Sequence, residues 1–207
     1  DGSSVYGLAS YYEFGHTGII ACGERYITND ADGTPRFSLE GDRFYNVVSK
    51  LASLFGRSGE YLSINNDSPN NYFSAFSSSR AAFMAGEIKE IQNLRSVDMD
   101  FGIVPLPKYD EEQKDYCSPV TSVVPVCMIP VTNTDTAITG TVLDALAYES
   151  CMNVLPVFYE INLSQKGLRD DDSIEMLGLI RDDRIFDVGD AYGWTTEVRE
   201  GIRKVID

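Results

Sequence analysis

The most evident candidates for chemistry are aromatic residues grouped near the start of the chain. One cluster places three rings and one carboxylate in consecutive positions: Tyr11, Tyr12, Glu13 and Phe14. Carbohydrate sites stack an aromatic face on the apolar side of a sugar ring and use polar groups for its hydroxyls. The same side chains also fill hydrophobic cores, so a core role is an equal alternative. Neighbouring residues point different ways, and Tyr12 and Phe14 are preferred to Tyr11 as ligand contacts.

A second aromatic group lies near the other end of the chain. Trp194 is the single tryptophan, and it stands where the last expected helix begins. At such an entry a tryptophan can stack on a ligand, and burial as core mass is an even alternative. Tyr192 and Asp190 are lesser candidates for the same site. Tyr116 could edge it as well, against the alternative of an ordinary loop residue.

Glu87 is a candidate of a different kind, because it follows Gly86 at the start of an expected helix. The free amides of a helix start can hold an anion or a hydroxyl group. A first-turn carboxylate that complements the helix dipole is the favoured alternative for Glu87.

Motifs of common enzyme chemistry are absent from the sequence, which contains no G-x-S-x-G elbow, phosphate-binding loop or dinucleotide fingerprint. The aspartate runs at residues 170–172 and 182–183 are typical of solvated helix ends. His16 has no evident nucleophile partner, and we expect a hydrogen-bonded helix residue. The four cysteines form no C-x-x-C pair, and most are expected to be buried: Cys22, Cys117, Cys127 and Cys151. We therefore predict no catalytic residue, no metal and no cofactor.

Charge narrows the classes of partner. The formal net charge is −15, and the basic residues form no stripe or run. Such a surface repels phosphate backbones, so nucleic acid is excluded as a partner. No apolar run approaches the roughly 20 residues that a membrane-spanning helix needs.

Short apolar runs alternate with amphipathic segments along the chain. Helices are expected over residues 12–22, 44–55, 69–77, 135–163, 171–180 and 192–206, with another opening at Gly86. Strands are expected at 81–85, 101–104 and 121–129, and an Asp-Gly hairpin at 26–39. This alternation predicts an α/β fold with a mixed, mostly parallel sheet flanked by helices. The strands are few for so long a chain.

Four stretches, taken in order, resemble the C-terminal part of extracellular solute-binding proteins of the maltose-binding type. They are residues 23–55, 76–87, 100–107 with the sequence Asp-Phe-Gly-Ile-Val-Pro-Leu-Pro, and 123–135. The resemblance implies a periplasmic-binding-protein-like type II lobe whose partner, the first lobe, is missing from this chain. Residues 1–207 would form one structural unit. Residues 1–125 and 190–207 would form or border the second lobe, and helices near 130–165 would pack on the missing first lobe.

The resemblance also implies a function. Members of this family bind a small solute between two lobes and deliver it to the membrane permease of an ABC importer. They place aromatic cleft residues about where Tyr12, Phe14 and Trp194 stand, whereas Glu87 and Ile88 here replace a frequent aromatic. A carbohydrate is the expected cargo, and a peptide, a polyamine or another organic solute stays open as an alternative. The protein is expected to be extracellular or at the cell surface, with a lipid anchor carried outside this chain.

Two alternatives stay open at this stage. One is an enzyme or sensor built on the same lobe architecture, since a fold does not fix a function. The other is a protein-interaction module that uses the exposed lobe face. Dimerisation of the excised chain would support the second alternative, and the bared apolar area could equally cause it.

Overall fold

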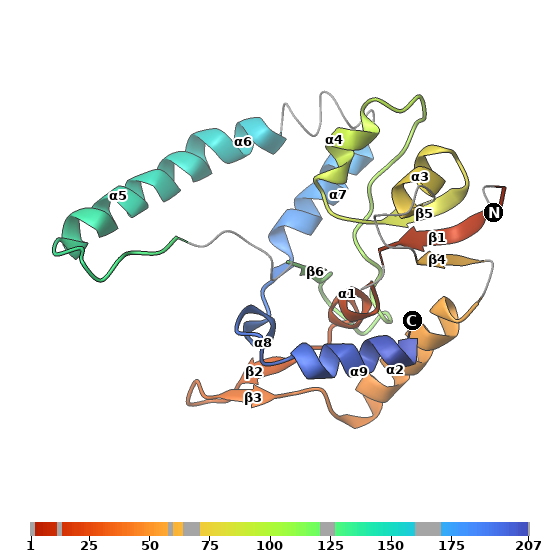
Figure 1. Cartoon of the computed structure of the whole chain (residues 1–207), viewed down its shortest axis with the longest axis horizontal. Coiled ribbons are helices and arrows are strands. Elements are labelled where there is room, and N and C mark those ends of the chain that lie inside the picture. Colours follow the sequence, from red (N-terminus) through yellow and green to blue (C-terminus); the bar gives the residue numbers. More distant parts are fainter. Residues whose placement is uncertain are drawn as a thin grey trace.

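The computed structural model describes residues 3–11, 14–57, 60–63, 71–120, 127–159 and 171–206, and it contains a small parallel sheet at one side of the molecule (Figure 1). The strand order is β4-β1-β5, with β1 (Tyr6–Ser10) between β4 (Tyr61–Ser63) and β5 (Ala81–Ala85) (Figure 1). In the register, Leu8 pairs with Tyr61 on one side and with Phe83 on the other. The predicted α/β class with a mostly parallel sheet is therefore confirmed.

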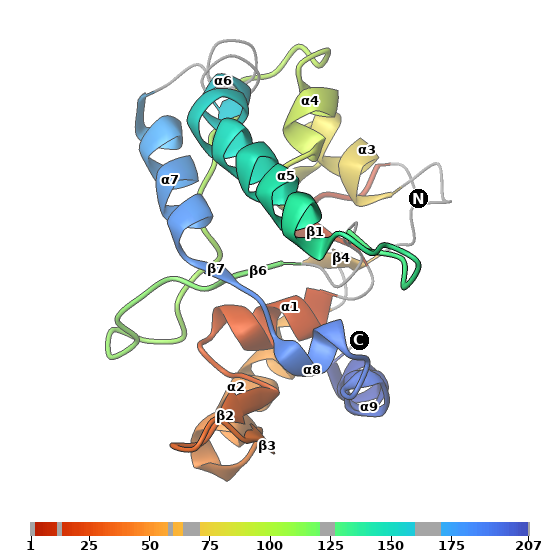
Figure 2. The same cartoon turned by 90° about the vertical axis from the view of Figure 1, so that its left-hand side faces the viewer.

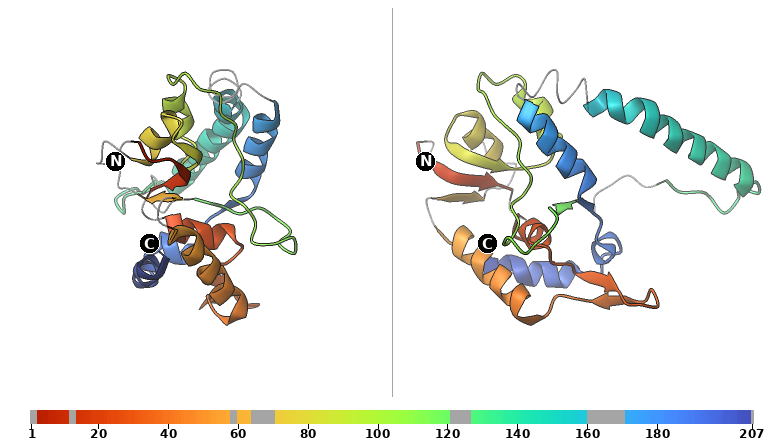
Figure 3. Two further views of the ribbon diagram at one scale, coloured as in Figure 1. Left: turned by 90° about the vertical axis from the view of Figure 1, so that its right-hand side faces the viewer. Right: turned by 180° about the vertical axis from the view of Figure 1, so that it is seen from behind.

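Three helices that are distant in sequence enclose the main core. They are α1 (Phe14–Ala21), α2 (Gly41–Phe55) and α9 (Thr196–Ile206), and they contact one another pairwise (Figures 1 and 3). Their buried side chains include Ile19, Val47, Leu51, Ile202 and Ile206. A smaller core lies where α3 (Tyr72–Ser77) packs on β1 and β5.

Two glycines of α1 allow these helices to approach closely. A Cβ at Gly18 would lie 3.1 Å from Leu51 Cδ2 of α2. One at Gly15 would lie 3.0 Å from Ile206 Cγ2 of α9. Both distances are shorter than ordinary van der Waals contact, so a larger residue would push the neighbouring helix away.

A long helical rod projects from this body. It consists of α5 (Thr136–Glu149), the π-helical segment η1 (Ser150–Val154) and α6 (Leu155–Val157) (Figures 1 and 2). Asp135 caps its start by accepting a hydrogen bond from Ile138 N at 3.0 Å, as the sequence predicts. The wide turns of η1 end two residues before Pro156, which lacks a backbone donor. None of the residues in these three segments is buried.

The described residues also contain a hairpin, a second pair of short strands and three further helices. The hairpin β2 (Ile27–Asn29) and β3 (Pro35–Phe37) is antiparallel, as predicted. Short strands β6 (Ser118–Pro119) and β7 (Arg184–Ile185) pair in parallel. The other helices are α4 (Glu90–Leu94), α7 (Asp171–Asp182) and α8 (Val188–Ala191).

Several predicted elements need correction. The helix expected from Gly86 begins at Glu90. Residues 101–104 form no strand, because Ile103 N donates to Ser173 Oγ at 3.0 Å and prolines at 105 and 107 supply no donors. Strands β1 and β4 were not predicted. Residues 68–69 and 121–126 lie outside the described residues, so those predictions stay untested.

Candidate functional site

An exposed pair of aromatic rings lies between α8 and α9. Tyr192 and Trp194 stack with their centroids 5.1 Å apart and their planes 20° from parallel. Although each is a large apolar surface, Tyr192 is 72% exposed and Trp194 is 56% exposed. We call these two rings the aromatic platform. The sequence candidates Tyr192 and Trp194 thus lie together, on the surface and not in the core.

Backbone hydrogen bonds fix the turn that carries the platform. Tyr192 N donates to Val188 O at 3.1 Å, and Trp194 N donates to Gly189 O at 2.8 Å. Gly193, between the two rings, has φ +70°, a left-handed value that glycine adopts without steric cost. The positions of both rings therefore follow the position of α8.

Asp187 anchors α8 through four backbone amides. Its Oδ1 accepts from Gly189 N at 2.9 Å and from Asp190 N at 3.2 Å, which caps the helix. Its Oδ2 accepts from Tyr26 N at 2.8 Å and from Ile27 N at 3.3 Å, at the start of β2. One buried carboxylate thus joins two segments that lie 161 positions apart in the sequence.

Asp190, two residues before Tyr192, lies in a second buried cluster. Arg199 Nη1 of α9 lies 2.5 Å from Asp190 Oδ1, and His16 Nε2 of α1 lies 3.8 Å from Oδ2. The Nδ1 atom of His16 forms a hydrogen bond with the Tyr26 hydroxyl at 2.8 Å. This cluster connects α1, α8 and α9.

His16 is neutral in this cluster at ordinary pH. Burial, and then the Arg199 guanidinium, lower the pKa of His16 to about 4, although Asp190 and Asp187 act in the opposite direction. Burial likewise raises the pKa of Tyr26. The neutral imidazole therefore acts as a hydrogen-bonding partner and not as a counter-ion of Asp190.

The carboxyl edge of the sheet gathers two further candidates. Tyr11 directly follows β1 and Glu87 follows the parallel neighbour β5, so both lie at the same edge. Tyr72 Oη donates to Glu90 Oε1 at 3.4 Å beside them, and burial, then Glu90, raise the pKa of Tyr72 to about 12. Glu87 itself is exposed and pairs with Lys89 at 2.6 Å. Tyr11 and Glu87 thus belong to this edge of the sheet, whereas Tyr192 and Trp194 stand between α8 and α9.

The other predicted site residues have different surroundings. Phe14 is only 8% exposed and packs against Phe55 at 5.7 Å between centroids, which favours the core role that the sequence left as the alternative to a ligand contact. Tyr12 and Glu13 lie outside the described residues. Tyr116 is half-buried under Lys108 Nζ, which lies 4.5 Å from the ring centroid.

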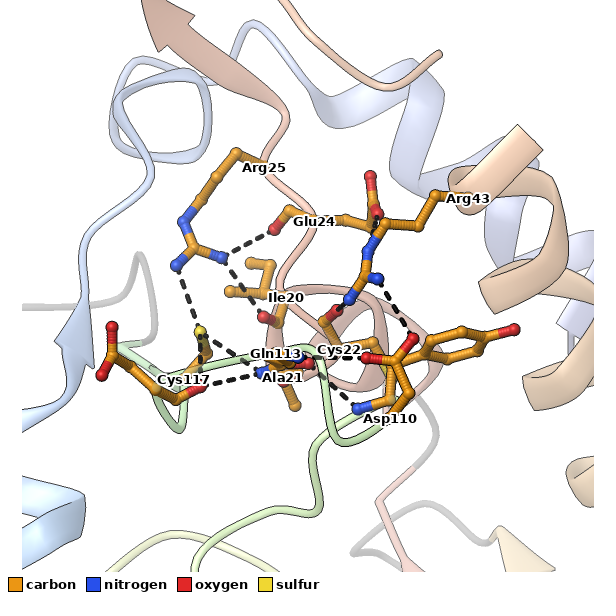
Figure 4. Close-up of polar contacts among 11 residues, drawn as sticks. Ile20, Ala21, Cys22, Glu24, Arg25, Arg43, Asp110, Gln113 and Cys117 are labelled. Atoms are coloured by element: carbon orange, nitrogen blue, oxygen red, sulfur yellow. Dashed lines mark hydrogen bonds and ion pairs between the residues drawn. The ribbon is translucent and has the colours of Figure 1, made fainter. Parts of the chain in front are cut away.

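A polar cluster at the end of α1 fixes the helix that carries His16 (Figure 4). Helix ends leave carbonyl groups without partners inside the helix. Here three consecutive carbonyls accept from three different side chains: Ile20 O from Arg25 Nη1 (3.3 Å), Ala21 O from Gln113 Nε2 (2.9 Å) and Cys22 O from Arg43 Nη2 (3.2 Å). The geometry is that of a helix cap with one donor from the adjoining loop and two from positions further along the chain.

Two of the four cysteines lie at this cap. Cys117 Sγ is 3.2 Å from Arg25 Nη2, and Cys22 is buried nearby with its pKa raised to about 11, mainly by burial (Figure 4). Cys127 and Cys151 are exposed, and all four are free thiols. Only two of the four are buried, so the prediction that most of them are buried is wrong.

The buried cluster was largely missed from the sequence. His16 was expected to be a hydrogen-bonded helix residue, and this is confirmed, but its partner Tyr26 was not foreseen. From the sequence, no role was predicted for Asp187 or Arg199. The one available signal was an aspartate directly before a short Val-Gly-Asp segment, which is typical of a helix N-cap.

Comparison with known proteins leaves the family open. No protein-family model matches the chain, and no curated protein matches it significantly. Within the described residues, no helix is long and apolar enough to span a bilayer. The same residues contain no group of three or more histidine, cysteine, aspartate or glutamate side chains placed to hold a metal ion.

Proposed function

We propose that the chain is the second lobe of a two-lobe solute-binding protein of the maltose-binding type, and that it binds a carbohydrate. We further propose that the protein acts outside the cell and delivers the bound solute to the membrane permease of an ABC importer. The observation that carries it is the exposed Tyr192–Trp194 platform.

The platform suits a sugar ring because of what it leaves uncovered. Two stacked rings hide their inner faces and present their outer faces, which are flat and apolar. A pyranose ring offers a matching face of C–H groups, and burial of such surface favours binding. Polar groups for the hydroxyls would come from the surrounding turn and from the partner lobe.

The projecting helical rod supports the presence of a partner lobe. Ile138, Val142 and Leu146 follow one another at a spacing of four residues and are all exposed on α5. Tyr148, Met152 and Leu155 form a further exposed apolar row. A helix that is apolar on several sides is ordinarily buried against another surface. The resemblance assigns that role to the first lobe.

Calorimetric titration of the chain with a panel of mono- and oligosaccharides tests this proposal. We expect at least one saccharide to bind, and the Trp194→Ala variant to bind it about tenfold more weakly, equivalent to about 1.4 kcal/mol. The matched control is Tyr45→Ala, which removes another exposed ring, on α2. The proposal is contradicted if the two variants bind the saccharide with equal affinity. It is also contradicted if neither the unaltered chain nor the chain joined to its first lobe binds any saccharide.

A second candidate function follows from the same rod. Its apolar rows would equally serve as a docking face for another protein. Sedimentation of the chain with and without saccharide separates the two: a docking module associates whether or not sugar is present and shows no saccharide binding.

A further inference from the structure

The orientation of the aromatic platform depends on the short helix α8. The platform stands on a turn whose amides bond back to α8, and α8 comprises only the four residues Val188–Ala191. A helix this short has no independent stability in water, because nucleation is costly and few bonds offset it. The orientation of Tyr192 and Trp194 therefore depends on whatever holds α8 in place.

Two aspartates hold α8 at its two ends. Asp187 fixes the amino end to β2 through four amide hydrogen bonds, described above. Asp190 fixes the far end to α9 through Arg199 and lies 3.8 Å from His16 of α1. Both carboxylates are more than nine-tenths buried, where a charge is costly unless it is fully partnered.

Packing leaves α8 little freedom to shift. A Cβ at Gly189 would lie 2.5 Å from Ile27 Cγ1 and 2.6 Å from Thr195 Cγ2. Thr195, which follows Trp194, is itself only 1% exposed. The exposed aromatic platform thus lies between two buried parts of the chain, the tightly packed α8 before it and Thr195 after it.

From these contacts we infer that Asp190, with Arg199, is a positioning residue for ligand binding: it sets the geometry of the Tyr192–Trp194 platform without touching the ligand. The expected effect on saccharide affinity rests on the proposed function. The expected effect on the geometry of the two rings does not depend on it. An aspartate with this role controls the ring stack in the unliganded protein as well.

The test uses Asp190→Asn, which keeps the size of the side chain and removes its charge. Near-ultraviolet circular dichroism of the unliganded protein reports the asymmetry around Trp194, the single tryptophan. We expect Asp190→Asn to lose at least half of the Trp194 signal and to bind saccharide about tenfold more weakly. Arg199→Lys, which keeps the positive charge beside Asp190, should lose less of the signal and of the affinity than Asp190→Asn does. Measurements are made at 10 °C, with full folding confirmed by far-ultraviolet circular dichroism.

The control is Asp182→Asn, which breaks the exposed ion pair between Asp182 and Arg181 at the end of α7. It should change neither the near-ultraviolet spectrum nor the affinity. If Asp190→Asn lowers only the melting temperature and leaves the spectrum and the affinity unaltered, the role is purely structural and the inference is wrong. If the unaltered protein binds no saccharide, the proposed function fails, and the unliganded spectrum alone then decides the inference.

Discussion

Among single residues, His16 has the most distinctive environment. Its pKa falls from about 6.5 to about 4 on folding, because the imidazole is buried beside Arg199. The unfolded chain therefore binds a proton at higher pH than the folded chain does. As the pH falls from about 7 towards 4, protonation favours the unfolded state, and the free energy of unfolding decreases. Above pH 7 both states are neutral at this residue and the contribution vanishes.

This sign gives a prediction for His16→Gln, which keeps a polar partner for Tyr26. Between pH 8 and pH 5 the unaltered protein should lose about 2 kcal/mol more stability than the variant, because the variant has no proton to gain. Urea unfolding at the two pH values measures both. The raised pKa of Glu24, caused mainly by burial, is common to both proteins and cancels in the comparison. An equal loss in the two proteins would show that His16 is not the group responsible.

Residue types in the sequence indicated which side chains could bind, but not where they would lie. Trp194 and Tyr192 are two positions apart, so a local turn brings them together and their association was predictable. Phe14 is also aromatic and was a candidate ligand contact for the same reason. It packs instead against Phe55, which is 41 positions further along the chain. Asp187 meets Tyr26 across 161 positions, and no local pattern specifies a contact of that range.

At the scale of elements, long periodic helices were predictable and short strands were not. Helix α2 repeats apolar residues at helical spacing, and α5 follows a capping aspartate, so both were identified. Strands β1 and β4 contain five and three residues, too few for an alternating pattern to stand out. Residues 101–104 have strand-like composition, but a side chain of α7 takes the amide of Ile103. Tertiary contacts thus decided what local propensity left open.

The uncovered row on α5 leads to an element-scale prediction. Replacing Ile138, Val142 and Leu146 together by lysine should abolish any concentration-dependent association of the chain. The melting temperature should change by no more than about 2 °C, because no residue of α5 is buried. Analytical ultracentrifugation and thermal unfolding measure the two effects.

The control for this triple variant adds the same charge elsewhere. Lysines at Asn46, Ser49 and Ser53 occupy exposed polar positions of α2. They should leave any association unchanged, which separates loss of apolar surface from simple charge repulsion. A large fall in melting temperature of the α5 variant would mean that the rod packs on the body of this same chain.

In the whole molecule, the last helix, α9, packs on the first helix, α1, and this contact joins the two ends of the chain. Helix α9 closes the main core against α1 and α2, and the aromatic platform stands immediately before it (Figure 1). The fold class followed from the alternation of short strands and helices. The three-helix core did not, since it joins residues from both ends of the chain. The stability of the core and the position of the platform therefore depend on the same helix.

Ile202 and Val205 of α9 test this dependence in one helix. Ile202 is buried in the main core, whereas Val205 is 64% exposed. Truncation of a buried isoleucine removes apolar contacts and leaves a cavity, so Ile202→Ala should lower the free energy of unfolding by about 2–4 kcal/mol. Val205→Ala removes two methyl groups that face solvent, and we expect a change within about 0.5 kcal/mol. Urea unfolding followed by far-ultraviolet circular dichroism gives both values, and similar losses for the two variants would mean that α9 does not close the core.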